Sequence, residues 1–143
     1  MLQYIVGISW TTVGTLLYAG QFISVVDFPL AQRLGLQENP EAADPLASWL
    51  ELMTARWDIV LLWIPPVAGL LLLLDHAWWP PAYLIAGGVY MDTGGREWAK
   101  IQGLATQGVP IGSAKETLVM KVTYGFFIVT GIAGVVLAFA DLM

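Results

Sequence analysis

A set of ionisable residues lies at the edges of long apolar segments, where charged side chains are expensive. It comprises Asp27, Asp58, Asp92, Arg96, Glu97, Lys100 and Lys121. Ionisable groups within membrane spans usually face the interior of the protein in pairs of opposite charge. Carboxylates from three segments meeting two or three cations could hold a proton, bind a headgroup or act as an acid and a base. The alternative is that each charged residue lies at a helix end in the headgroup layer, with the apolar part of its side chain along the lipid and the charged group in water.

Asp92 and Arg96 stand out within this set. They are one helical turn apart, as are Arg96 and Lys100, so a continuous helix would carry one charged face. The apolar part before them, residues 82–91, is too short to cross a membrane alone. Either the helix continues with its charges facing other helices, or it breaks at Gly94–Gly95 next to a polar cavity or boundary. Asp92 is the candidate acid or base, with Arg96 as its charge partner.

Aromatic residues near the same segment ends could supply the walls of a site for a flat, apolar ligand. Aromatic side chains at such positions are also typical anchors at the membrane interface. The two kinds of residue together give the expected ligand-binding set, which comprises Asp27, Asp58, Asp92, Arg96, Glu97, Trp57 and Tyr124.

Other motifs indicate neither a metal nor a cofactor, and we expect none. The string Asp92-Thr93-Gly94 also marks aspartic proteases, but that chemistry needs two such carboxylates and the chain has one copy. His76 is the only histidine, and with Asp75 it would make a poor metal site. The absence of cysteine excludes disulfides, thiolate metal sites and cysteine-based redox chemistry.

The composition indicates an integral membrane protein. Apolar residues make up 57% of the chain and charged residues 12%, against about 25% charged in ordinary soluble domains. The charges are also excluded from long runs, which a soluble core would not require. The formal net charge of −5 argues against nucleic acid as a partner, because nucleic acid is bound by neutralising phosphates with Lys and Arg.

The run from Trp57 to Met91 organises the expected fold, because it holds two apolar segments hinged at Asp75-His76. We expect an all-α, integral membrane four-helix bundle, with residues 1–143 forming a single transmembrane domain. The expected spans are residues 2–26, 57–74, 80–100 with a polar second half, and 122–140. Pro65-Pro66 predicts a kink in the second span that faces the bundle.

The connection between the first two spans predicts an amphipathic interfacial helix at about residues 45–56. Asp44 reads as its N-cap and Pro45 as its first residue. Its apolar positions are Leu46, Trp49, Leu50, Met53 and Trp57. This face would lie on the membrane surface, or against a partner protein, before the chain enters the second span.

Small residues repeat every four positions in the first and fourth spans. The first stripe is Gly7, Thr11, Thr15 and Ala19, and the second is Thr130, Gly134 and Ala138. Such stripes let helix backbones approach closely in lipid. We therefore hypothesise that these two spans pack directly against each other.

The basic residues predict the orientation. Every Lys and Arg lies in or beside the first and third connections, which share one side of a four-span protein. The positive-inside bias places that side in the cytoplasm. We expect an integral protein of a bacterial cytoplasmic (inner) membrane, with both termini on the non-cytoplasmic side.

The leading functional hypothesis is a small polytopic membrane protein that binds a lipid-like or isoprenoid-like molecule. The ligand would occupy a polar-lined pocket near the cytoplasmic leaflet, where acid/base chemistry is possible. One alternative is a non-catalytic subunit of a larger membrane complex. Another is a small proton-coupled transporter that acts as a dimer, with Asp58 or Asp92 as the proton site. The expected partners are membrane lipids, a hydrophobic small molecule, and a second copy or a membrane-complex partner.

Overall fold

Apolar segments bounded by proline, glycine and small polar residues form helices in the computed structural model, which describes residues 2–143. The helices are α1 (Leu2–Val26), α2 (Phe28–Arg33), α3 (Pro45–Leu61), α4 (Ile64–Leu73), α5 (Trp79–Thr106) and α6 (Ala114–Leu142). No strand occurs within residues 2–143, where one isolated bridge joins Ala43 and Ile111. The prediction of an all-α fold is confirmed over this range.

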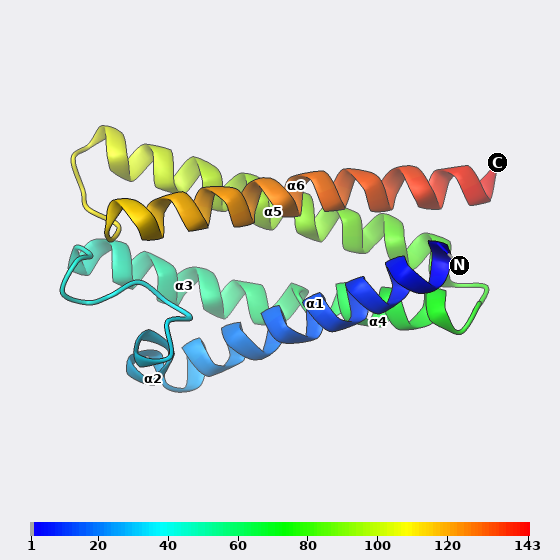
Figure 1. Ribbon diagram of the computed structural model, residues 1–143, viewed down its shortest axis with the longest axis horizontal. Coiled ribbons are helices and arrows are strands. Elements are labelled where there is room, and N and C mark those ends of the chain that lie inside the picture. Colours follow the sequence, from blue (N-terminus) through cyan, green and yellow to red (C-terminus); the bar gives the residue numbers. More distant parts are fainter. Residues whose placement is uncertain (1) are drawn as a thin grey trace.

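The long helices run along a common direction (Figure 1). α1 packs against α3 and α4, α4 packs against α5, and α5 packs against α6. Both termini lie at one end of the molecule, together with the turn between α4 and α5 (Figure 1). The connectors 34–44 and 107–113 lie at the opposite end (Figure 1). We call this the connector end.

Short sequence signals fix the helix ends near the connectors. The helices α2 and α5 both stop at a glycine in the left-handed region, Gly35 and Gly108, each with φ +71°. The amides around each glycine bond back to the last helical turn, as in a Schellman motif. Asp44 caps α3 by accepting from the amide of Leu46 at 2.8 Å, with Pro45 in the first turn. These ends set the lengths of the two connectors.

The helix α6 begins at Ala114, well before the span expected from residue 122. Ser113 and Glu116 form a capping box: the Ser113 hydroxyl accepts from the amide of Glu116, and the Glu116 carboxylate accepts from the amide of Ser113 at 2.7 Å. The glycine-rich composition of residues 101–113 hides this signal. The Ser-x-x-Glu pattern is nevertheless a known sequence signature of a helix start.

Replacing Ser113 with alanine should lower the free energy of unfolding by about 1 kcal/mol, because the first turn of α6 loses a cap acceptor. Chemical denaturation followed by circular dichroism measures the change. Ser113→Asp keeps an acceptor at this position and should stay close to the original stability. Equal losses in both variants would show that the cap contributes nothing.

The expected kink at Pro65-Pro66 is a break between two helices. α3 ends at Leu61 and α4 begins at Ile64, so both prolines lie in the first turn of α4. A proline is tolerated there because the amide hydrogen it lacks has no partner within the helix anyway. Pro66 also packs closely on α1, since a Cβ added to Gly14 would lie 2.7 Å from Pro66 Cδ.

The amphipathic helix expected at residues 45–56 does not end where the second span was expected to begin. It continues through Leu61 as α3, because nothing in the sequence interrupts it before the prolines. Its expected apolar face points outward, with Trp49 and Trp57 about half exposed. The buried face is Ala47, Glu51, Ala55 and Asp58. The inward side of α3 therefore carries both of its carboxylates.

The helix α5 passes through Gly94–Gly95 without a break, so the helix continues into its charged second half. Its buried positions repeat at intervals of three and four, and include Tyr83, Ala86, Tyr90, Thr93 and Glu97. The N-terminal part of this stripe, from Tyr83 to Tyr90, builds an aromatic core. The ring centroids of Trp10 and Tyr83 lie 4.3 Å apart, and those of Tyr90 and Phe127 lie 5.5 Å apart. The C-terminal part of the stripe carries the buried charge of Glu97.

The small-residue stripes of α1 and α6 do not pack against each other, contrary to our hypothesis. A Cβ added to Gly69 of α4 would lie 2.6 Å from the Thr11 amide nitrogen and 2.9 Å from the Gly7 carbonyl oxygen. A Cβ added to Gly131 of α6 would lie 2.6 Å from the carbonyl oxygen of Gly87 in α5. The first stripe thus meets Gly69 of α4, and the close approach of α6 to α5 is at Gly131, beside the second stripe. Gly134 of the second stripe faces the Trp10 ring of α1 and no member of the first stripe.

Within residues 2–143, two segments are long and apolar enough to cross a membrane, Pro45–Leu73 and Ala114–Leu142. The outward surface is apolar on the other helices too, and large hydrophobic side chains of α1 such as Ile8, Leu16 and Phe22 are at least half exposed. Charged side chains are buried instead, among them Glu51, Asp58 and Glu97. The molecule therefore has an apolar exterior around a partly charged interior.

Candidate functional site

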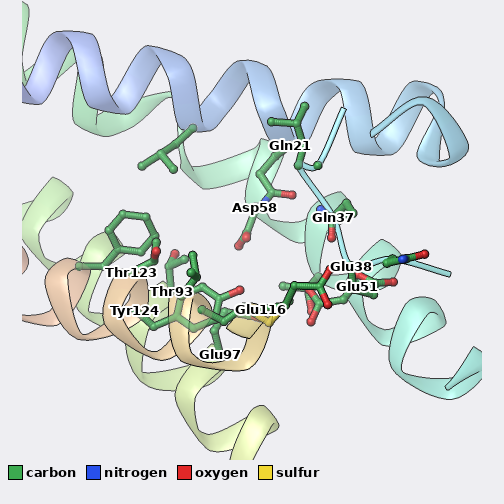
Figure 2. Close-up of a pocket in the computed structure, with 18 of the residues that line it drawn as sticks. Gln21, Gln37, Glu38, Glu51, Asp58, Thr93, Glu97, Glu116, Thr123 and Tyr124 are labelled. Atoms are coloured by element: carbon green, nitrogen blue, oxygen red, sulfur yellow. The ribbon is translucent and has the colours of Figure 1, made fainter. Parts of the chain in front are cut away.

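A cavity of about 600 Å³ lies near the connector end, between α1, α3, α5, α6 and the segment 34–44 (Figure 2). Its polar lining includes Gln21, Gln37, Glu38, Glu51, Thr54, Asp58, Thr93, Glu97, Thr123 and Tyr124. Its apolar lining includes Leu17, Leu36, Leu62, Val119, Met120 and Phe127. A volume of this size suits a small organic ligand.

The segment 34–44, which we call the strap, covers the cavity at the connector end. Near its start, Gln37 Nε2 donates to Ser24 Oγ of α1 at 2.9 Å. At its far end, the amide of Asp44 donates to the carbonyl of Pro110 at 2.8 Å, beside the bridge between Ala43 and Ile111. Fixed at both ends, the strap holds Glu38 against the cavity.

Ion pairs of alternating sign join α3 to α5 beside the cavity. Arg96 lies 2.5 Å from Asp58 and 3.1 Å from Glu97. Lys100 lies 2.5 Å from Glu97 and 2.8 Å from Glu51. We call these five residues the charge network. Buried charges are tolerated when they are paired and hydrogen-bonded in this way.

The network is not symmetric with respect to the cavity. Its carboxylates Glu51, Asp58 and Glu97 line the cavity, whereas Arg96 and Lys100 do not. Figure 2 shows the three carboxylates entering the same space from α3 and α5. The cations thus lie behind the carboxylates, and a ligand would meet acceptor oxygens first.

Glu38 adds a further carboxylate that is not part of the network. The residue is 1% exposed, and both of its carboxylate oxygens are buried without a hydrogen-bond partner among residues 2–143. The Gln21 side-chain oxygen and the Thr93 hydroxyl are buried and unpartnered in the same cavity. Unsatisfied buried polar groups are rare in native proteins, so this cluster needs an explanation.

The cavity also follows the seam between α1 and α6, which share few contacts. Leu17 and Gln21 of α1 face Val119, Thr123 and Phe127 of α6 across it. A second cavity of about 300 Å³ lies at the other end of the same seam and is lined by Gln3, Val6, Leu72, Trp79, Leu137, Ala140 and Asp141.

Between the two cavities, the seam is closed by Trp10. A Cβ added to Gly134 of α6 would meet the Trp10 ring. The seam is thus packed in the middle and loose towards both ends.

The structure places the expected ligand-binding residues in different surroundings. Asp58, Glu97 and Tyr124 line the cavity. Arg96 lies behind its wall and contacts Asp92 at 3.6 Å, but the Asp92 side chain is 53% exposed. Asp27 caps α2 by accepting from the amide of Leu30 at 2.9 Å, and Trp57 points outward.

Three cavity carboxylates were not among the expected site residues: Glu38, Glu51 and Glu116, the last of which caps α6. A signal for Glu51 was present, because Ala47, Glu51, Ala55 and Asp58 form one helical stripe of small and acidic residues opposite the apolar one. No local pattern marks Glu38. Its burial depends on how the strap folds back over the cavity.

The chain matches no protein-family model, no curated protein and no solved structure. The functional assignment therefore depends on the geometry of the cavity itself.

Proposed function

We propose that this protein is a four-span membrane protein that binds a lipid-like or isoprenoid-like amphiphile in the cavity near the cytoplasmic leaflet. The observation that carries the proposal is the cavity at the α1–α6 seam, which combines acidic groups at its base with apolar side chains on its walls. An amphiphile needs both kinds of surface in one site.

The helix lengths and their surfaces support four spans. The 28 residues of α5 and the 29 residues of α6 extend about 42–44 Å at about 1.5 Å per residue, longer than a hydrocarbon core of about 30 Å. Arg96 and Lys100 of α5 pair with carboxylates of α3, Asp92 is exposed beside Arg96, and the lipid-facing positions of α5 include Ile85 and Met91. A helix with charges in its second half can then lie in a membrane, because Arg96, Glu97 and Lys100 are paired with one another and with α3.

The basic residues support the orientation. They are Arg33, Arg56, Arg96, Lys100, Lys115 and Lys121. Arg33 lies on α2 and Arg56 on α3, while the other four lie in the second half of α5 and the first half of α6, which meet the connector end (Figure 1). Under the positive-inside bias this end faces the cytoplasm, the cavity opens in that leaflet, and both termini lie on the other side.

The seam supplies an entry route for a molecule that arrives from the lipid. The cavity is lined from both α1 and α6. An apolar chain could pass between them while its headgroup reaches Asp58 and Glu97. Acid/base chemistry on the ligand would fall to these carboxylates rather than to the exposed Asp92.

Filling the cavity should remove the bound molecule. We expect native mass spectrometry of the protein in mild neutral detergent to show a defined extra mass, and we expect Thr123→Trp to lose at least about nine tenths of it, a tenfold weakening. Thr123 lines the cavity, so an indole there occupies the ligand's space.

Val122→Trp is the matched control, because Val122 is 65% exposed on the same helix and an indole there should leave the extra mass in place. Retention of the mass in Thr123→Trp would place the ligand elsewhere. A protein that carries no extra mass, and that is recovered only in complex with other proteins, would overturn the proposal and favour a subunit of a larger complex.

A further inference from the structure

We infer that the cavity selects amphiphiles with a cationic, hydrogen-bond-donating headgroup, such as a protonated amine, and that Glu38 is its principal partner. This inference rests on the proposed function and adds to it the chemical class of the headgroup. It follows from the unpartnered groups in the cavity and from the charges around them.

The first argument is the state of Glu38. A carboxylate that is 1% exposed and makes no hydrogen bond within residues 2–143 is costly to bury. A cation at its two oxygens would offset that cost and form charge-assisted hydrogen bonds. Glu38 lines the cavity, so the partner can be a molecule that enters it (Figure 2).

The protein does not provide that cation from its own side chains. Arg96 and Lys100 are each shared between carboxylates of the charge network. Lys115 lines the cavity, but its side chain is exposed and forms no ion pair within 4.0 Å among residues 2–143. The Glu116 carboxylate, which also lines the cavity, already accepts from the amide of Ser113 in the cap of α6. Glu38 remains without a counter-charge.

The charge balance of the site points the same way. Glu38, Glu51, Asp58 and Glu97 are accompanied by two cations, Arg96 and Lys100, and the remaining lining charges, Lys115 and Glu116, are one of each sign. A ligand headgroup therefore enters a field with an excess of negative charge. An anionic headgroup would be repelled by these oxygens. A neutral one would leave Glu38 without a counter-charge.

The remaining unpartnered atoms favour a headgroup that carries N–H donors. The Gln21 side-chain oxygen can only accept a hydrogen bond, and the Thr93 hydroxyl can accept one. A primary ammonium has three donors, so it can bond to Glu38 and still donate to a further acceptor of the lining. A quaternary ammonium has the charge but no donor.

A series of probes that share one alkyl chain tests the inference on the unmodified protein. Dodecylamine, dodecanol and dodecanoate at neutral pH present a cationic, a neutral and an anionic headgroup. We expect native mass spectrometry in neutral detergent to rank their affinities in that order, with dodecylamine about tenfold to a hundredfold tighter than dodecanol. Dodecyltrimethylammonium should fall between the two.

Glu38→Gln should reduce the affinity for dodecylamine by about tenfold to a hundredfold and leave that for dodecanol within about threefold. Glu41→Gln is the matched control, because Glu41 is an exposed carboxylate on the same strap. It should change neither affinity. A preference for the cation that survives Glu38→Gln would overturn the role of Glu38.

Equal affinity for the cationic, neutral and anionic probes would overturn the inference while leaving amphiphile binding intact. Failure of every probe to bind, together with no co-purified mass, would instead count against the proposed function. The probe series decides the headgroup question even if Glu38→Gln does not fold, because it needs no variant.

Discussion

Replacing Arg96 with alanine should lower the free energy of unfolding by about 3–5 kcal/mol, among the largest losses for a single side chain in this protein. Asp58 and Glu97 flank the guanidinium, and the side chain of each is 2% exposed. Removing the cation leaves two buried carboxylates. Glu97 keeps its ion pair with Lys100, but Asp58 loses the cation with which it pairs. The change can be measured by titrating the protein from a neutral detergent into sodium dodecyl sulfate and following its helix signal.

Two further variants show whether the loss comes from the uncompensated carboxylates. Arg56→Ala removes an exposed arginine from the neighbouring helix and should change stability by no more than about 0.5 kcal/mol. Adding Asp58→Asn to Arg96→Ala removes one orphaned charge and should restore a large part of the loss, because neutral replacements of a buried pair are often well tolerated. A double variant as unstable as the single one would mean that Arg96 acts through packing alone.

The charge network was partly predictable because its members share a helix. Arg96, Glu97 and Lys100 lie within two turns of α5, and the helical period alone puts charges at these positions. The placement of Asp58 opposite them depends on how α3 packs. The i,i+4 pair of Asp92 and Arg96 looked the strongest in the sequence, yet Asp92 is exposed and Arg96 makes its closest contact with Asp58.

The burial of Glu38 could not be predicted from its neighbours in sequence. The strap has the composition of an ordinary polar connection, and Glu41 on the same segment is exposed. What buries Glu38 is a pair of distant attachments, to Ser24 at one end and to Pro110 at the other. A contact that depends on three separate parts of the chain leaves no local periodicity to detect.

The orientation of α3 shows which of its two stripes marks the interior of the protein. The stripe of Leu46, Trp49 and Trp57 exists, but it faces outward. In a water-soluble protein such a stripe would mark the core. Where the surroundings are apolar, the inward face can be the polar one, so the Ala47–Glu51–Ala55–Asp58 stripe marked the interior.

Replacing Gly87 with leucine should lower the free energy of unfolding by about 3 kcal/mol, because α5 and α6 touch through their backbones at this point. A Cβ on Gly87 would lie 2.7 Å from the carbonyl oxygen of Gly131 and 2.7 Å from a methyl carbon of Val135. A flexible side chain could move away from the new atoms, but a backbone carbonyl in a helix cannot. The two helices would have to separate.

The neighbouring glycine provides the control for this substitution. A Cβ on Gly88 meets nothing within 4 Å, so Gly88→Leu adds the same side chain at an open position of the same helix. It should be neutral or stabilising by up to about 1 kcal/mol, since leucine favours a helix more than glycine does. Equal effects at both positions would show that α5 and α6 are not held at backbone contact. Because Gly94 meets the carbonyl of Tyr124 in the same way one heptad further along, loss of this contact would also open the wall of the cavity.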